Sequence, residues 1–355
     1  MTTVAELLRR AVQGDPPARR ETRDLLRAVA RGEVPLEALA SLLTALAIHG
    51  QTVETLLGLV DAARETMVPV PCRRRDAIDV CGTGGDGQGT VNLSTAAAFV
   101  VAGAGVPVAK HGNHGLSSRS GSADVLAALG CALELAPGEV ADAIDTLGLG
   151  FIYAPLHHPL FARVGPLRRL LGFRTAFNLL GPLCNPAGVT RQLLGAASPA
   201  AQRQLAEVLA ALGAERALVV HTPGPYDEVT LTAPASAIWV ERGALAALTF
   251  TPEDFGCAPV APSDLVGGAP AFNAARLLAV LEGEPGPLRR AVCANAACAL
   301  LVAGAAPDVA VGFRRAEASI DSGAARDVLR RLRAFTRRAA GIGEDEEAGR
   351  DVVAG

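Results

Sequence analysis

The stretch DAIDVCGTGGDGQGTVNLSTAAAFVVAGAGVPVAK, residues 76–110, decides the fold class. Residues 76–80 form a short apolar run that suits a buried strand, and glycines follow it at once. Residues 94–105 have the small side chains and spacing of a buried helix, and residues 106–110 form a second apolar run. A strand, a loop, a helix and a strand in this order predict a parallel sheet in an α/β domain.

The flanking sequence extends this prediction to two domains. Leucine and alanine recur at helical spacing through residues 4–67, which predicts an N-terminal helical domain over residues 1–70. Strand and helix patterns alternate over residues 71–336, which predicts a larger α/β domain with a central, mostly parallel sheet. Within it we expect a hairpin over residues 230–245 and a loop over FNLLGPLCNPAG, residues 177–188. Part of 158–180 is expected to pack on the helical domain, and 337–355 to be a mobile tail.

The composition of the chain excludes some kinds of binding partner and indicates its cellular compartment. The 355 residues carry a net charge of −3 with a pI near 6.1, which argues against a nucleic-acid or membrane partner. The N-terminal residues do not resemble a secretory signal. Seven scattered cysteines without a Cys-x-x-Cys pair predict reduced thiols in a cytoplasmic protein. The apolar surplus of the N-terminal helices leaves two explanations open: packing against another subunit, or burial against the same chain.

The loop DVCGTGGDGQGTVNLST, residues 79–95, has the composition of an anion site. Its glycines let backbone amides approach a phosphate closely, and Ser94 and Thr95 stand where the next helix begins. The loop is no Walker A motif, because no Lys-Ser/Thr follows the glycines, and it does not fit G-x-G-x-x-G. A glycine turn with a helix cap is the alternative. Asp86, Asn92, Ser94 and Thr95 so close together favour the anion site.

Lys110 is the only lysine in the sequence, and it ends the second predicted strand. Open α/β sheets bind ligands at the carboxyl ends of their strands. The segment KHGNHGLSSRSGSAD, residues 110–124, adds Ser117, Ser118 and Ser122 as possible donors to phosphate oxygens. A solvated loop is the alternative. Two polar loops after consecutive strands open on one edge of the sheet, which favours a shared site.

Asp227 and Glu228 are adjacent carboxylates in GPYDEVTLT, residues 224–232. Carboxylate oxygens beside phosphates suit Mg²⁺, a hard cation. An Asp-Glu pair alone is equally typical of a solvated surface.

Three arginines, Arg163, Arg168 and Arg169, lie on a helix predicted over residues 159–171. An arginine beside a cleft could bind a carboxylate through two parallel hydrogen bonds, although a solvated basic face explains at least two of the three. His158, at the start of this helix, is either a packed structural histidine or part of an active-site wall.

Together, the segments DVCGTGGDG, VNLSTAAA, KHGN, SGSADVLAALG, FNLLGPLCNPAG and YDEVT resemble the anthranilate phosphoribosyltransferase family in order and spacing. The resemblance extends from the N-terminal helices to about residue 336. It implies a nucleoside-phosphorylase-like phosphoribosyltransferase fold and a homodimer formed through the helical domain. The implied reaction transfers the phosphoribosyl group of 5-phosphoribosyl 1-diphosphate (PRPP) to the amine of anthranilate, the second step of tryptophan biosynthesis from chorismate. Two Mg²⁺ ions per active site and anthranilate synthase components as partners are implied as well.

The resemblance also implies roles for individual residues. PRPP would be bound by Gly82, Gly85, Asp86, Thr90, Asn92, Leu93, Ser94, Thr95, Lys110, Ser118 and Ser122. Anthranilate would be contacted by Gly82, Asn113 and Arg168, and magnesium by Ser94, Asp227 and Glu228. Lys110, Asp227 and Glu228 would be the catalytic residues, because stabilising the departing pyrophosphate matters most in such a reaction.

One residue departs from the family pattern, and it leaves alternatives open. The family usually reads K-H-G-N-R, whereas His114 follows Asn113 here. A histidine is only partly charged near neutral pH, so a paralogue that phosphoribosylates another aminobenzoate is one alternative. A catalytically lapsed relative that binds nucleic acid is opposed by the acidic pI and the intact loops. A nucleoside phosphorylase of the same fold should lack the KHGN and FNLLGP segments, and a purely structural or regulatory protein should lack three such clusters.

Overall fold

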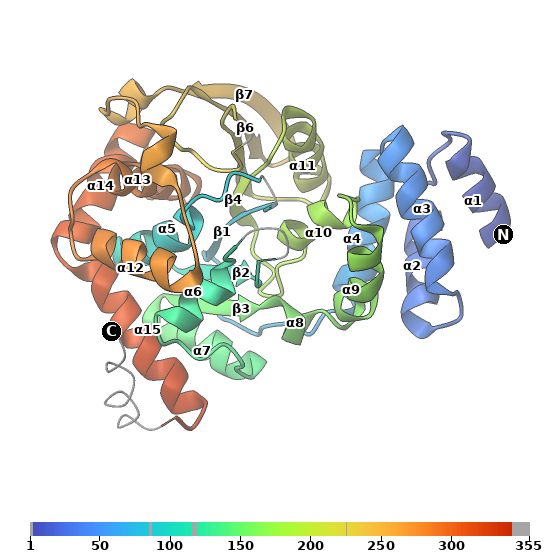
Figure 1. The fold of residues 1–355 in the computed structure, drawn as a ribbon, viewed down its shortest axis with the longest axis horizontal. Helices are drawn as coiled ribbons and strands as arrows, with labels where there is room; N and C mark the ends of the chain where they lie inside the picture. The colour runs from blue at the N-terminus through green and yellow to red at the C-terminus, as the bar shows by residue number, and fades with distance from the viewer. Residues whose placement is uncertain (1–2, 85–86, 116–118, 225, 343–355) are drawn as a thin grey trace.

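The computed structural model describes residues 3–84, 87–115, 119–224 and 226–342 of the chain. A helical bundle lies at one end of the molecule, and a seven-stranded sheet with its covering helices forms the rest (Figure 1). The fold class predicted from the sequence is therefore confirmed. No helix in these four ranges combines the length and the apolarity that crossing a bilayer requires.

Leucine-rich faces and side-chain caps build the bundle. Its helices are α1 (Val4–Val12), α2 (Arg19–Arg31), α3 (Leu36–His49) and α4 (Val53–Thr66). Thr3 and Thr52 cap α1 and α4 by accepting a hydrogen bond from an amide of the first turn. A Cβ at Gly58 would lie 2.3 Å from the carbonyl oxygen of Arg19, so the close contact of α4 with α2 requires glycine.

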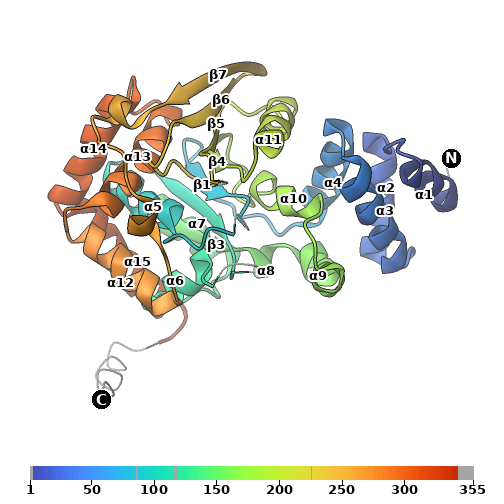
Figure 2. The same ribbon diagram turned by 45° about the horizontal axis from the view of Figure 1, so that its top comes forward.

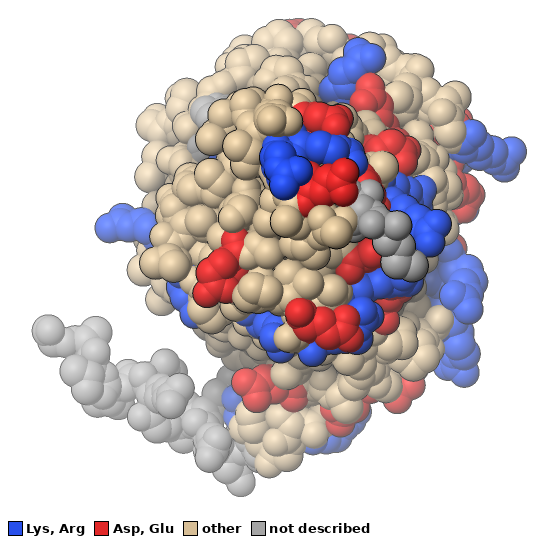
Figure 3. Space-filling view, turned by 90° about the vertical axis from the view of Figure 1, so that its right-hand side faces the viewer, with Lys and Arg blue, Asp and Glu red and all other residues tan. Residues whose placement is uncertain are grey.

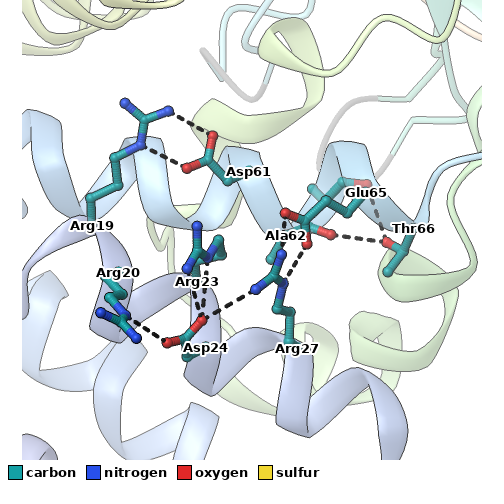
Figure 4. A network of polar contacts seen from close by, with 10 residues as sticks. Arg19, Arg20, Arg23, Asp24, Arg27, Asp61, Ala62, Glu65 and Thr66 are labelled. Carbon is teal, nitrogen blue, oxygen red and sulfur yellow. Dashed lines mark hydrogen bonds and ion pairs between the residues drawn. The ribbon is translucent and has the colours of Figure 1, made fainter.

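Ion pairs cross the outer side of the same two helices. Arg19 binds Asp61 at 2.7 Å and Arg27 binds Glu65 at 2.5 Å, and each pair joins α2 to α4 (Figure 4). Arg27 also contacts Asp24 on its own helix. These side chains are partly exposed, so each pair adds little stability by itself. Burial of the leucines on the inner side is the larger contribution.

Later segments of the chain return to the bundle. The helices α8 (Ala154–His157), α9 (Pro159–Leu171) and α10 (Phe177–Leu183) follow the third strand. Of these, α9 packs on α3 and α4, and α10 packs on α4. The Arg64 guanidinium of α4 donates two hydrogen bonds, of 2.9 and 2.7 Å, to the Leu183 carbonyl at the end of α10. Helical and α/β segments thus share one apolar cluster.

Five parallel strands and an antiparallel pair form the sheet, in the order β3-β2-β1-β4-β5-β6-β7. The strands are β1 (Ile78–Gly82), β2 (Val108–Gly112), β3 (Leu149–Tyr153), β4 (Arg191–Gly195), β5 (Arg216–His221), β6 (Ala235–Glu241) and β7 (Ala244–Phe250). Both β1 and β2 extend two residues beyond their predicted ends, because glycines at those ends continue the pairing: Gly82 with Gly195, and Gly112 with Tyr153.

Helices cover both faces of the sheet (Figure 2). The remaining helices are α5 (Leu93–Gly103), α6 (Ser122–Ala128), α7 (Pro137–Leu147), α11 (Pro199–Ala211), α12 (Pro270–Leu281), α13 (Pro287–Val302), α14 (Val309–Asp321) and α15 (Ala324–Ala339), with 3-10 turns at Pro252–Phe255 and Pro262–Leu265. The central helix α5 is surrounded by α13, α14 and α15, while α11 packs on β5 and β6. The largest apolar cluster lies around α5 and α13.

Two predicted connections differ from the structure in detail. Residues 177–183, predicted as a loop, form the helix α10 despite Gly181 and Pro182, because Phe177 and the neighbouring leucines are buried in the bundle cluster. The hairpin predicted over 230–245 is present, but its strands are residues 235–241 and 244–250. Arg242 and Gly243 connect them, with φ values of 47° and 86°, as a two-residue hairpin turn requires.

Candidate active site

A cavity of about 290 Å³ lies where the strands β1 and β2 end, between the sheet and the helices α9 and α10. Strand order reverses beside β1, the position at which open α/β sheets bind ligands. Most of the residues that the sequence assigned to substrates line this one cavity: Gly82, Thr90, Asn92, Ser94, Thr95, Lys110, Asn113, Ser122, Arg168, Asp227 and Glu228.

Four assigned residues are not placed there. The Leu93 side chain is fully buried in the core beside α5 and does not line the cavity. Gly85, Asp86 and Ser118 lie outside the described residues, as does Ser117.

Glycines at the strand ends make room for Asp227. A Cβ at Gly82 would lie 2.5 Å from the Asp227 Oδ2, and a Cβ at Gly195 only 1.5 Å from the Asp227 carbonyl oxygen. The Thr83 amide donates to the Gly195 carbonyl at 3.0 Å, which holds the start of the glycine loop against β4. The paired glycines of β1 and β4 therefore fix where the acidic pair enters the site.

The acidic pair is bound to the two backbone segments that were predicted to bind anions. The Gly84 amide of the glycine loop donates to Asp227 Oδ2 at 2.7 Å. The Ser94 amide, in the first turn of α5, donates to Glu228 Oε1 at 2.8 Å. Asp227 is 8% exposed. Both carboxylates thus occupy amide donors that stabilise negative charge.

Two threonine hydroxyls of the site could still form hydrogen bonds with a polar ligand. Thr83 and Thr95 line the cavity, and their hydroxyl oxygens are buried without a hydrogen-bond partner among the described residues. A buried hydroxyl without a partner is costly. Its satisfaction by a bound ligand, such as a phosphate, is the simplest explanation.

Lys110 reaches the cavity from β2 with its ammonium group largely buried. Its Nζ donates to the Val80 carbonyl of β1 at 2.7 Å, and the residue is 3% exposed. Burial lowers the pKa of Lys110, while the negative charges of Asp79 and Glu228 oppose that shift. Burial likewise raises the pKa of Asp79, which lies fully buried beneath the loop. A cation held here can interact strongly with an anion in the cavity.

Asp124 organises the second loop. One of its oxygens accepts the amides of Gly115 and Gly121, at 2.9 and 2.7 Å, and the other lies 2.5 Å from His114 Nδ1. Burial raises the pKa of Asp124, but these hydrogen bonds outweigh it, and the pKa lies below its usual value. The His114 ring also meets Tyr153 edge to face, with centroids 5.3 Å apart. His114 therefore holds the base of the loop.

An aromatic wall from α9 and α10 closes the other end of the cavity. Arg168 lies 5.9 Å from the centre of the Phe177 ring, and burial lowers its pKa. Phe161 meets Phe177 edge to face and stacks on His158 at 4.6 Å. A planar aromatic acid fits such a wall, because its ring can stack while its carboxylate meets the guanidinium.

Two buried histidines support this wall. His111 Nδ1 lies 3.1 Å from the Gly181 carbonyl, which can only accept, so Nδ1 carries the proton. His111 Nε2 then accepts from His158 Nε2 at 3.1 Å. Burial lowers the pKa of His111 to about 3 and that of His158 to about 4, so both rings are neutral at physiological pH. His158 is thus a packed support behind the cavity, while His111 lines it.

Sequence reasoning missed several residues that line the cavity: Thr83, His111, Phe161, Phe177 and Asn178. His111 and Phe177 belong to the motifs KHGN and FNLLGP, which carry the resemblance to the family. Their position within these motifs could have indicated that they line the site. No signal in the sequence pointed to Phe161, because only the packing of α9 turns this side chain toward the cavity.

The residues present fit a magnesium site. Asp227, Glu228 and the Ser94 hydroxyl offer hard oxygen atoms at one end of the cavity. Two carboxylates and a hydroxyl leave coordination positions for water and for phosphate oxygens, which is how proteins usually hold this ion.

Comparisons with known proteins agree with this geometry. The glycosyl transferase family model of the a/b domain matches residues 74–326, and the model of its helical bundle domain matches residues 5–67. The class of protein is therefore a glycosyl transferase.

Individual relatives narrow that class. An anthranilate phosphoribosyltransferase of Rubrobacter xylanophilus is 47% identical over 339 residues, which cover 95% of this chain and 99% of the relative. The solved structure of the enzyme from Thermus thermophilus matches with a TM-score of 0.88 and 42% identity, covering 93% of this chain and 99% of that one. That of the Saccharomyces cerevisiae enzyme, in complex with PRPP and Mg, matches the fold with a TM-score of 0.86 at 24% identity, covering 94% and 98%. The chain belongs to the anthranilate phosphoribosyltransferase family, which confirms the resemblance inferred from its motifs.

Proposed function

We propose that this chain transfers the phosphoribosyl group of PRPP to the amine of anthranilate, giving N-(5-phosphoribosyl)anthranilate and diphosphate. The observation that carries the proposal is the two-ended cavity. One end holds buried threonine hydroxyls, Lys110 and two carboxylates, and the other holds Arg168 on an aromatic wall. A polyanionic donor fits the first end and an aromatic carboxylic acid fits the second. No observation supports the alternatives of another aminobenzoate or a nucleic acid.

Positioning is the main catalytic contribution that we infer from this geometry. The aromatic amine already carries a lone pair at neutral pH, so its attack on the anomeric carbon demands no strong base. The serine and threonine hydroxyls that line the cavity would orient the donor. Lys110 would stabilise the negative charge that develops on the departing diphosphate.

We further propose that Mg²⁺ is required, with two ions per active site. Asp227, Glu228 and the Ser94 hydroxyl would hold them beside the donor phosphates. When bound, the ions neutralise charge on the leaving diphosphate.

A fluorescence assay tests the proposed reaction. Incubation of the protein with PRPP, MgCl₂ and anthranilate should consume the anthranilate fluorescence, and chelation of the metal should stop the loss. Other aminobenzoates in place of anthranilate test the paralogue alternative. Faster consumption of one of them than of anthranilate would reject the proposed acceptor.

The domain division that we propose follows the sequence: a helical domain over 1–70, an α/β domain over 71–336 and a tail over 337–355, although residues 337–339 still belong to α15 (Ala324–Ala339). A homodimer through the helical domain is also proposed. It is supported by exposed apolar residues on α1 and α3, Val12 at 59% and Ile48 at 71% exposure. The end of the molecule that carries the bundle shows broad uncharged areas between acidic and basic side chains (Figure 3). Apolar side chains exposed in this way favour contact with a partner.

Light scattering checks this proposal. We expect a dimer mass for the chain, and a monomer mass for Ile48→Asp. Leu248→Asp, an equally large change at a partly exposed position on β7, is the control and should stay dimeric. Adding anthranilate synthase components to the same experiment tests that predicted partner.

A cytoplasmic location is proposed from the cysteines. All seven are free thiols, and six of them are buried. Burial raises the pKa of Cys131, Cys184, Cys293 and Cys298 to about 12, which keeps those thiols protonated and unreactive. Thiols without disulfides are typical of a reducing compartment.

A further inference from the structure

Arg174 connects two parts of the site that the chain separates by some ninety residues. It lies on the exposed segment between α9 and α10, outside the residues that line the cavity. Its Nη1 donates a hydrogen bond of 2.8 Å to the carbonyl of Gly84 in the glycine loop. An arginine from the acceptor side therefore contacts the backbone of the donor side.

Gly84 is held through both of its backbone polar groups. Its amide donates to Asp227 at 2.7 Å, and its carbonyl accepts from Arg174. Its φ of +64° lies in the left-handed region, where glycine is strongly favoured. The direction of the glycine loop at this residue thus depends on a carboxylate of the proposed metal site and on a guanidinium of the acceptor side.

The segment that carries Arg174 is itself fixed to the acceptor wall. The Thr175 amide donates to the Asn178 side chain at 2.8 Å, and Asn178 lines the cavity. Phe177, beside it, is buried under Arg168. A displacement of the α9–α10 segment would consequently be transmitted to Gly84.

We propose that Arg174 is a positioning residue, which holds the donor-binding glycine loop in register with the acceptor wall. It acts through Gly84 and not on the substrates. The inference rests on the proposed transfer reaction, because it assigns the two ends of the cavity to PRPP and anthranilate. Loss of this contact lets Gly84 turn, so the donor is held less well and its anomeric carbon is presented less accurately to the amine.

The test compares Arg174→Ala with Arg174→Lys, and takes Arg169→Ala on α9 as the matched control. Arg169 is an exposed arginine of the same region that does not line the cavity. Steady-state rates are measured over a matrix of PRPP and anthranilate concentrations, and PRPP binding with Mg²⁺ is measured separately by calorimetry.

For Arg174→Ala we expect the KM for PRPP to rise about fivefold to tenfold, because the charged donor to the Gly84 carbonyl is lost. A fall in kcat should accompany it, with the thermal midpoint unchanged. Arg174→Lys retains a positively charged donor group and should recover part of the loss, while Arg169→Ala should stay within about twofold of the unchanged chain.

Two outcomes overturn the inference. One is transfer by Arg174→Ala with KM values and kcat within about twofold of the unchanged chain. The other is a rise in the KM for anthranilate alone, which would make Arg174 an acceptor contact. Failure of the proposed reaction is a separate result, because the unchanged chain would then show no transfer at all. In that case calorimetry still decides, since PRPP should bind more weakly to Arg174→Ala than to Arg169→Ala.

Discussion

Arg168 is the residue on which acceptor binding should depend most. Its guanidinium lies half-buried against the Phe177 ring, so an anthranilate carboxylate would meet it in a partly dry site. Arg168→Ala should raise the KM for anthranilate by a factor corresponding to roughly 1.5–3 kcal/mol, the usual contribution of a hydrogen bond to a charged group. The KM for PRPP should change much less. Arg169→Ala is the control, and an unchanged KM for anthranilate in Arg168→Ala would contradict the assignment.

The contacts of His114 change the role that we assign to this residue. The sequence suggested an altered acceptor site. In the structure His114 lines the cavity, but its ring is paired with Asp124 at the base of the second loop. His114→Arg should therefore leave the order of preference among aminobenzoates unchanged. Asp124→Ala removes the acceptor of two loop amides and of His114, so it should raise the KM for PRPP about tenfold. Rates with several aminobenzoates check both statements, and a switch of acceptor in His114→Arg would refute the first.

At the scale of elements, the strand ends should tolerate almost no change. Gly195→Ala would place its Cβ 1.5 Å from the Asp227 carbonyl, so β4 or the acidic pair must move. We expect a loss of transfer activity of at least about a hundredfold, with a lower thermal midpoint as backbone contacts are displaced. Gly138→Ala on α7, where the added Cβ meets no atom within 4 Å, is the control and should retain activity. Equal activity of the two variants would show that the site adapts to the shift.

The elements also show what the sequence could and could not predict. Local patterns sufficed for β1, α5 and β2, because apolar runs, glycines and small residues follow each other within a few dozen positions. The helix α10 was missed, since its stability comes from burial in the bundle and not from its own residues. Among site contacts, Gly84 to Asp227 and Ser94 to Glu228 span 143 and 134 residues, and only tertiary packing brings them together. Motif recognition placed these residues in one site, but not the amides that they bind.

For the whole molecule, stability should fall in acid because of the buried histidines. The folded chain holds His111 and His158 neutral, with pKa values of about 3 and about 4, whereas unfolded histidine titrates near 6.5. Between these values the unfolded chain binds more protons than the folded one. The free energy of unfolding therefore falls as pH drops from about 6.5, by about 1 kcal/mol per pH unit for each ring.

Urea titrations between pH 7 and pH 4.5 measure this dependence. The double variant His111→Gln, His158→Gln should show a shallower fall than the unchanged chain. His49→Gln, at an exposed position on α3, serves as the control. Equal slopes in all three proteins would mean that carboxylates, and not this pair, determine the acid sensitivity.

The single lysine also makes the protein an unusual target for amine chemistry. Apart from the chain terminus, an acylating reagent finds one amine, that of Lys110, a residue that lines the cavity and is 3% exposed. Its lowered pKa gives a larger unprotonated, nucleophilic fraction than an ordinary lysine has at the same pH. One mass increment on a peptide that contains Lys110 would thus report access to the donor end directly. Its suppression by PRPP would measure occupancy of the site without any turnover.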